Sequence, residues 1–137
     1  MKHLLDSGNF KLEWELQIFE NDISFPTNTI LAVTVFSNGF SAQTTMDISI
    51  KDFSVFTCNL KQLYDTLQGS ARLEEPYGMH NHIEFLCTEN GYIVVNGILN
   101  NYGKNGLAQE LHFENEFDQT YLKNFVNELY LTYEKYR

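Results

Sequence analysis

The sequence predicts an α+β fold in which an antiparallel β-sheet of about six to seven strands packs against two α-helices. Three observations support this prediction. Apolar and polar residues alternate over most of the chain, which is the period of half-buried strands. Asn-Gly pairs, a strong signal for β-hairpins, separate such runs at 38–39 and 90–91. Helical three- and four-residue spacing occurs in two segments, near 52–68 and 118–135.

Three strands are expected before the first helix. In residues 10–20, one side of the alternation is apolar and the other side carries charged or amide groups. Residues 30–50 contain two further strands joined at Asn38-Gly39, where a type I′ turn needs positive φ at both central positions. The apolar side of the first strand consists of Phe10, Leu12, Trp14, Leu16 and Ile18.

The first helix is predicted over 52–68, and four more strands follow it. Asp52 is suited to cap the N-terminus of this helix, and Gly69 is suited to follow its C-terminus in a left-handed conformation. Strands are then expected at 70–75, 82–88, 92–100 and 107–115, with Asn90-Gly91 as the turn between the second and the third.

The second helix is predicted over 118–135 and closes the domain. Asp118 is its expected N-cap, and Lys135 and Arg137 lie near the negative end of its dipole. Its apolar stripe should pack against the sheet and contribute to the core. The residues expected to be buried in that core are Trp14, Phe56, Leu63, Phe85, Phe125 and Leu129.

The size and charge of the chain limit its partners. Its 137 residues are expected to form one domain over 1–137. The 9 basic and 18 acidic residues give a formal charge of −9, which should repel nucleic acid and anionic membranes and attract a basic partner. We expect a cytoplasmic protein, because we find no leader pattern, no apolar run near the roughly 20 residues of a membrane helix, and two cysteines that should be free.

A short histidine-containing segment raises the possibility of a metal site. His80, His82 and Glu84 would share one strand face if the strand began at His80, and a His-x-His pair can bind zinc in that geometry. The parity of the apolar residues that follow places these side chains on the solvent side. The positions of His3 and His112 in the sequence do not indicate that either of them belongs to this site. We therefore expect exposed imidazoles, with no metal and no cofactor.

The sequence contains no recognisable catalytic constellation. There is no glycine-rich phosphate loop, no nucleophile elbow, no C-x-x-C pair and no H-E-x-x-H motif. Carboxylate pairs such as Glu13 and Glu15 are expected by chance in a chain with 18 acidic residues. The prediction is a protein that is not an enzyme.

Three stretches together resemble the WapI family of bacterial immunity proteins. They are FSNGFSA at 36–42, LYDTLQGSARLEEPYG at 63–78 and QELHFENEFDQTYLKNFVNEL at 109–129. The similarity extends roughly from Phe10 to Leu131, and its most specific part is FENEFDQTYL. The resemblance implies a small cytoplasmic, non-enzymatic protein. Such a protein binds the C-terminal domain, typically a nuclease, of a large polymorphic toxin displayed on the bacterial wall, and it blocks that domain.

The expected partner contacts follow from the assumption that an open sheet face binds the toxin. We predict that polar strand faces and loops carry them, at Glu13, Glu15, Glu74, Glu75, Glu84, Glu110, Glu114 and Tyr102. For Tyr102, an exposed anchor and a ring folded back over the sheet remain equally open. Two alternatives are a small-ligand or metal-binding protein that uses His80, His82 and Glu84, and an interaction domain unrelated to toxins. The toxin's substrate and the oligomeric state stay undetermined at this level.

Overall fold

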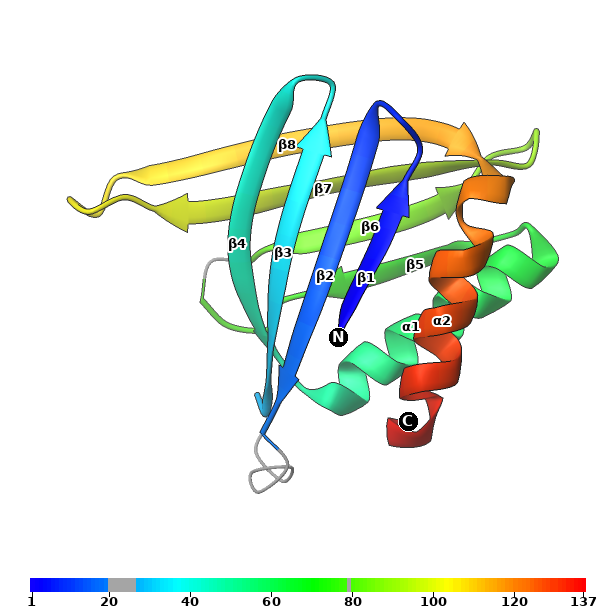
Figure 1. The fold of residues 1–137 in the computed structure, drawn as a ribbon, viewed down its shortest axis with the longest axis horizontal. Coiled ribbons are helices and arrows are strands. Elements are labelled where there is room, and N and C mark those ends of the chain that lie inside the picture. Colours follow the sequence, from blue (N-terminus) through cyan, green and yellow to red (C-terminus); the bar gives the residue numbers. More distant parts are fainter. Residues whose placement is uncertain (20–26, 79) are drawn as a thin grey trace.

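Two four-stranded antiparallel sheets form the framework of the protein (Figure 1). The computed structural model describes residues 1–19, 27–78 and 80–137. Within these residues the first sheet contains β1 (Lys2–Asp6), β2 (Phe10–Ile18), β3 (Thr29–Ser37) and β4 (Phe40–Ile48). The second sheet contains β5 (Ser70–Glu74), β6 (His82–Cys87), β7 (Tyr92–Tyr102) and β8 (Ala108–Asp118). Within each sheet, strands that follow one another in the sequence pair with each other.

Two α-helices complete the fold. Helix α1 (Ile50–Thr66) connects the two sheets, and α2 (Lys123–Tyr133) follows β8. Short 3-10 turns, η2 (Gln119–Tyr121) and η3 (Glu134–Tyr136), lie on either side of α2. The α+β class, the antiparallel pairing and both predicted helices are therefore confirmed. None of the helices in the described ranges is long and apolar enough to cross a membrane.

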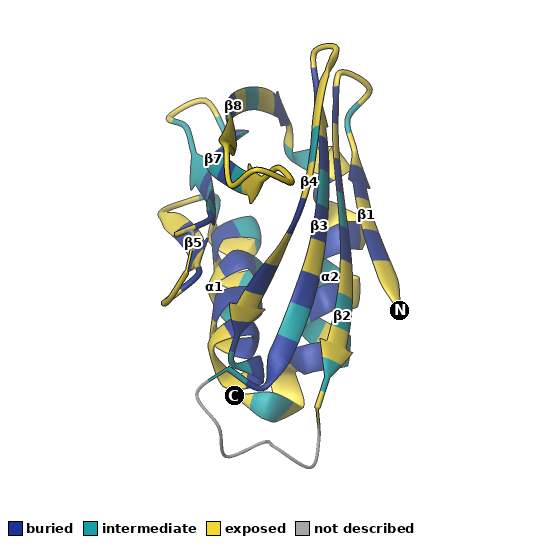
Figure 2. Cartoon of the chain, turned by 90° about the vertical axis from the view of Figure 1, so that its left-hand side faces the viewer, coloured by how far each residue is buried: buried dark blue, intermediate teal, exposed yellow. Residues whose placement is uncertain are grey.

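The strands of the first sheet run across those of the second, and the helices lie between the sheets (Figures 1 and 2). Trp14 on β2 shows how this core is built, because its ring is fully buried and contacts aromatic rings of both helices. Its ring centroid lies 5.6 Å from that of Phe53, 5.6 Å from that of Phe56 and 5.3 Å from that of Phe125. The inner faces of both sheets thus share one core, and the outer faces point away from each other.

The predicted core is confirmed at every position. The six side chains are at most 3% exposed, and they come from both sheets and both helices: Trp14, Phe56, Leu63, Phe85, Phe125 and Leu129. Alternation within strands and the apolar stripes of helices identify buried positions, because each element buries one face.

The number of strands and their arrangement differ from the prediction. The described residues form eight strands in two sheets, where the sequence predicts about six to seven strands in one sheet. Strand β1 was not predicted, because its inward positions are His3 and Leu5 while Leu4 faces solvent, which breaks the apolar alternation. The single sheet was wrong because a two-residue period identifies the buried face of a strand and does not identify its partners.

The ends of α1 also differ from the prediction. Ser49 is the N-cap, since its side chain accepts a hydrogen bond of 2.9 Å from the Asp52 amide. At the other end the left-handed residue that ends the helix is Leu67, with φ 54°. Gly69, two positions later, also has a positive φ, of 88°, as expected, but it does not directly follow the helix. Ile50 continues the alternation of the preceding strand, so the sequence pattern hides the start of the helix. Asp118 was expected to cap the second α-helix, but it caps the 3-10 turn η2 that precedes it, where its carboxylate accepts from the Thr120 amide at 2.9 Å, and the N-cap of α2 is Leu122.

Both Asn-Gly turns lie where they were predicted, but their conformations differ. Asn38 and Gly39 have φ of 50° and 92°, which fits a type I′ turn. In the second turn Gly91 has φ 80°, whereas Asn90 is not among the residues with positive φ. The Gly91 amide donates to the Thr88 carbonyl at 3.0 Å, which makes a three-residue loop with a glycine bulge.

The free edge of β4 is covered by side chains of the second sheet. Three hydrogen bonds satisfy backbone groups along this edge: Asn101 Nδ2 to the Gln43 carbonyl at 2.8 Å, Asn81 Nδ2 to the Thr45 carbonyl at 3.4 Å, and the Asp47 amide to Glu75 Oε2 at 2.8 Å. The two sheets are therefore joined at this corner by polar contacts as well as by the core.

Candidate interaction surface

The outer face of the second sheet brings four of the predicted contact residues together. Strand register places Arg72 beside Glu84 and Glu114 in the same row, across Asn96. The adjacent row contains Glu74 and His82, followed by Ile98 and His112. We define the acidic face as the following eight outward side chains of this sheet: Arg72, Glu74, His82, Glu84, Glu110, His112, Glu114 and Glu116.

The acidic face carries a strong excess of negative charge. Its ionisable groups include five carboxylates and one guanidinium, Arg72, which contacts Glu74 at 3.2 Å and Glu84 at 3.9 Å. The hydrogen bond from Arg72 lowers the pKa of Glu74, which keeps this carboxylate ionised at neutral pH. Burial, and then repulsion from Arg72, lowers the pKa of His82, so that its imidazole is neutral at pH 7.

One acidic residue of this face, Glu116, was missed by the sequence reasoning. It lies on β8 opposite Val94, and it is exposed on the same side as Glu110 and Glu114. Its two-residue spacing from Glu114 is the signal that could have identified it. On the same strand, Glu110 and His112 contact each other directly.

Glu13 and Glu15 lie on a different surface. Both point outward from β2, on the outer face of the first sheet, which faces away from the acidic face (Figure 2). Basic side chains interleave with them here, since Lys2 Nζ lies 3.3 Å from Glu13 and Lys11 Nζ lies 4.0 Å from Asp6. The predicted contact residues therefore do not form one surface, because the two sets lie on opposite sides of the molecule.

Glu75 was expected to be an exposed contact residue, and this expectation is wrong. Its side chain is 4% exposed and accepts hydrogen bonds from the Asp47 amide at 2.8 Å and from Asn81 Nδ2 at 3.4 Å. Since Glu74 points outward, the alternation of β5 already places the next residue on the inner side. Glu75 joins the two sheets and is not available to a partner.

Tyr102 lies at the exposed tip of the second sheet. It ends β7 and is 59% exposed, which favours the exposed ring over one folded back across the sheet. Leu107, on the other side of the same loop, is 67% exposed. Near this tip a groove of about 390 Å³ separates β4 from β7 and β8, and it is lined in part by Phe40, which is 70% exposed. Exposed apolar side chains thus adjoin one end of the acidic face.

The histidine segment does not assemble as the metal hypothesis requires. Strand β6 begins at His82, while His80 precedes it with a φ of 59°, so the alternation does not extend to His80. His82 and Glu84 share the outer face and are half-buried, and His80 is exposed. In the described part of the chain, no group of three or more His, Cys, Asp or Glu side chains could hold a metal ion.

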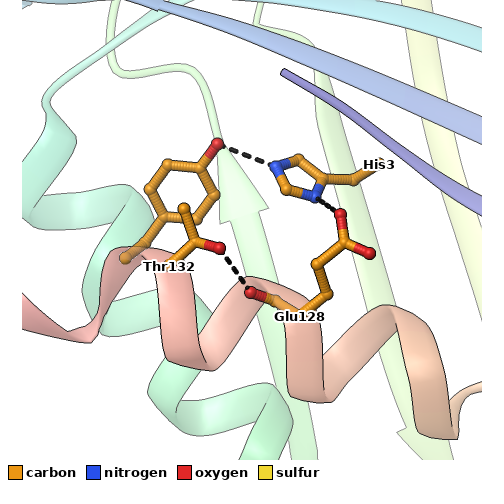
Figure 3. Close-up of polar contacts among 4 residues, drawn as sticks. His3, Glu128 and Thr132 are labelled. Carbon is orange, nitrogen blue, oxygen red and sulfur yellow. Dashed lines mark hydrogen bonds and ion pairs between the residues drawn. The ribbon is translucent and has the colours of Figure 1, made fainter.

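A polar cluster around a buried imidazole, which the sequence reasoning missed, joins the two ends of the fold (Figure 3), and the side chain of its carboxylate residue, Glu128, is 45% exposed. His3 on β1 is 1% exposed, and its Nδ1 lies 2.6 Å from Glu128 Oε1 on α2. Its Nε2 lies 2.8 Å from the hydroxyl of Tyr133, which is 4% exposed. Both contacts are satisfied when Nδ1–H donates to the carboxylate and Nε2 accepts from the hydroxyl.

The cluster has the order carboxylate, imidazole, hydroxyl, but its position favours a structural role. A substrate cannot reach the Tyr133 hydroxyl, because both the tyrosine and His3 are almost completely buried. Burial, followed by the nearby Glu128 charge, raises the pKa of Tyr133 to about 12, which opposes its ionisation. The hydrogen bonds therefore hold β1 against α2.

Comparison with protein families identifies a match over nearly the whole chain. Residues 5–137 match the model of a family described as "Immunity protein WapI-like family". A search among curated proteins gave no match.

Proposed function

Because the chain belongs to the WapI-like immunity protein family, we propose that it binds and neutralises the C-terminal domain of a cognate wall-associated polymorphic toxin. The family match over residues 5–137 is the observation that carries this proposal. The proposed toxin domain is a nuclease, and the proposed site of action is the cytoplasm of the cell that makes the toxin. In this role the protein is an antitoxin in competition between bacteria.

The proposed inhibition needs binding alone and no chemistry by the immunity protein. A nuclease domain that binds a phosphate backbone presents basic side chains to it. The five carboxylates of the acidic face are complementary to such a surface, and they would compete with the nucleic acid for it. The net charge of −9 adds long-range attraction that accelerates the encounter. We expect nanomolar or tighter affinity, as in other specific inhibitory complexes.

Co-expression tests this proposal directly. We expect the coding region of the toxin domain to lie immediately upstream, and the domain encoded there is produced in a sensitive host with and without the immunity protein while growth is recorded. A tagged immunity protein is then used to isolate the complex. We expect protected growth and a stable complex. Unprotected growth together with no complex would refute the immunity function.

A further inference from the structure

The free edge of β8 is suited to bind an added strand, and this inference rests on the proposed function and deepens it. We propose that the toxin domain supplies an extended, basic segment that pairs with this edge as a fifth strand of the second sheet. Strand addition is a common mode of protein recognition, because an unpaired edge offers a row of backbone hydrogen-bonding groups.

Strand β8 is the long open edge among the described strands. Strands β1 and β5 are edges of five residues each, and they lie against α2 and α1 respectively. The edge of β4 is covered by the side chains of Asn81, Asn101 and Glu75. By contrast β8 has eleven residues, and within the described ranges it pairs with no strand other than β7.

The hydrogen-bond pattern shows which backbone groups of β8 face the open edge. In an antiparallel ladder, alternate residues direct their N–H and C=O groups toward one neighbour and then toward the other. The Gly103 amide donates to Leu107 at 2.9 Å, so odd-numbered residues of β7 bond to β8. The Thr88 amide donates to Tyr92 at 2.8 Å, so even-numbered residues of β7 bond to β6. The even-numbered residues of β8 therefore direct their backbone groups away from β7.

The same residues carry the charges of β8. Glu110, His112, Glu114 and Glu116 are even-numbered, and their side chains point to the acidic face. Side chains directly opposite each other on neighbouring strands have Cβ atoms roughly 5 Å apart. A strand added here would consequently place every second side chain beside this acidic row, which favours Lys or Arg at those positions. The intervening side chains would point inward, where Leu111 and Phe40 line the groove.

A second copy of this chain fits the edge poorly. Pairing β8 with β8 of another copy would place Glu114 and Glu116 among carboxylates of the same kind, and like charges on opposite strands are destabilising. A basic partner has the complementary charge. The negative charges of Glu110, Glu114 and Glu116 thus favour binding of the toxin over self-association at this edge.

Amide hydrogen exchange distinguishes strand addition from contact through side chains. The full chain is measured by NMR, free and bound to the toxin domain encoded upstream. In the free protein, the amides of Leu111, Phe113 and Asn115 should exchange slowly and those of His112, Glu114 and Glu116 rapidly. In the complex we expect the exchange of the second group to slow at least about 100-fold, as ladder hydrogen bonds form.

A pair of variants at one position provides a second measurement. Glu114→Pro removes an edge N–H group, whereas Glu114→Gln removes the charge and keeps that group. We expect Glu114→Pro to weaken toxin binding about 100-fold or more and Glu114→Gln less than about tenfold. Melting temperatures of the free variants establish that both are folded. If the proline variant does not fold, the exchange measurement decides.

Three outcomes are distinguishable. Alternating protection of β8 in the complex supports strand addition. A complex in which the His112, Glu114 and Glu116 amides still exchange rapidly overturns it and leaves the immunity function standing. Failure to form a complex, with unprotected growth, removes the immunity function and this inference together. A free protein that sedimentation shows to be a dimer, with these amides already protected, would assign the edge to a second copy and overturn the proposal.

Discussion

At the scale of single residues, burial determines the cost of a substitution. Leu129 and Leu131 lie on the same helix, but the first is fully buried and the second is 75% exposed. We expect Leu129→Ala to lower the free energy of unfolding by about 2–5 kcal/mol, because it removes apolar contacts and leaves a cavity. Leu131→Ala should change it by less than about 0.5 kcal/mol. Urea denaturation measures both, and a loss below about 1 kcal/mol for Leu129→Ala would contradict the packing of α2 described above.

The buried hydroxyl of Tyr133 predicts a dependence on alkaline pH. Its pKa is raised from 10.0 to about 12, so the folded protein holds this proton more tightly than the unfolded chain. The resulting stabilisation is fully present below pH 10 and is lost as the pH rises from about 10 through about 12. We expect the free energy of unfolding to fall over this range, and to fall less in Tyr133→Phe. Tyr121→Phe, at a 51% exposed position, is the control and should retain the wild-type slope.

The same substitution also has an effect at neutral pH. Tyr133→Phe leaves Nε2 of the buried His3 without its hydroxyl partner, which should cost about 1–3 kcal/mol. Equal stability of the two proteins at pH 7, measured by urea denaturation, would show that the hydrogen bond contributes nothing to the fold.

Local alternation gave correct burial for the core residues, but it could not identify all of their polar partners. It placed Trp14 and Phe85 inside because each follows the period of its strand. The roles of His3 and Glu75 depend on partners that are far away in the sequence, 125 residues for the contact between His3 and Glu128. Such contacts follow from the tertiary arrangement. The spacing of apolar residues within a single strand or helix cannot predict them.

At the scale of secondary-structure elements, the start of α1 offers a test of capping. The Ser49 side chain accepts the Asp52 amide, while the sequence assigned the cap to Asp52 itself. We expect Ser49→Ala to cost about 1 kcal/mol, because it leaves an N-terminal amide of the helix without its acceptor. Asp52→Ala should cost less than about 0.5 kcal/mol, since it removes only an exposed charge in the first turn. Denaturation of both variants decides between the two assignments, and the reverse order would favour Asp52.

Elements were more predictable than their assembly. Asn-Gly turns and apolar periods located seven of the strands and both helices, because these signals arise within short windows. These local signals could not show that the strands before α1 and the strands after it form two different sheets. That division depends on the core around Trp14, where rings of both helices enter between the sheets.

At the scale of the whole molecule, the distribution of charge predicts how the toxin associates. We expect its association rate to fall about tenfold when salt rises from about 0.05 to 0.5 M, because salt screens attraction between exposed charges beyond roughly 10 Å. Dissociation should change less, since it depends on the desolvated centre of the interface. Stopped-flow mixing at the two salt concentrations measures both rates. An association rate that does not depend on salt would leave the immunity function intact and remove its electrostatic explanation.

Charge reversal shows which side of the molecule the toxin approaches. The double change Glu114→Lys and Glu116→Lys alters the acidic face, and Glu13→Lys with Glu15→Lys makes the same change in charge on the opposite side. We expect the first pair to slow association more than the second. The reverse result would move the interface to the first sheet.

The candidate surface was partly predictable from the sequence. Glu74, Glu84, Glu110 and Glu114 were identified as exposed acids, and strand register places them on one side. Their separation from Glu13 and Glu15 could not be predicted, because it follows from the division into two sheets. The family match supports the partner class, and neither the sequence nor the match assigns a contact residue.

The hydrogen bonds that His3 makes with Glu128 and Tyr133 also bear on protein synthesis. A nascent chain leaves the ribosome N-terminus first, so β1 emerges long before the residues of α2 that it contacts. Until those residues have been translated, the imidazole of His3 has neither of its two partners. While the residues of α2 are still inside the ribosome, β1 can pair with β2 but cannot yet be joined to the helix through His3.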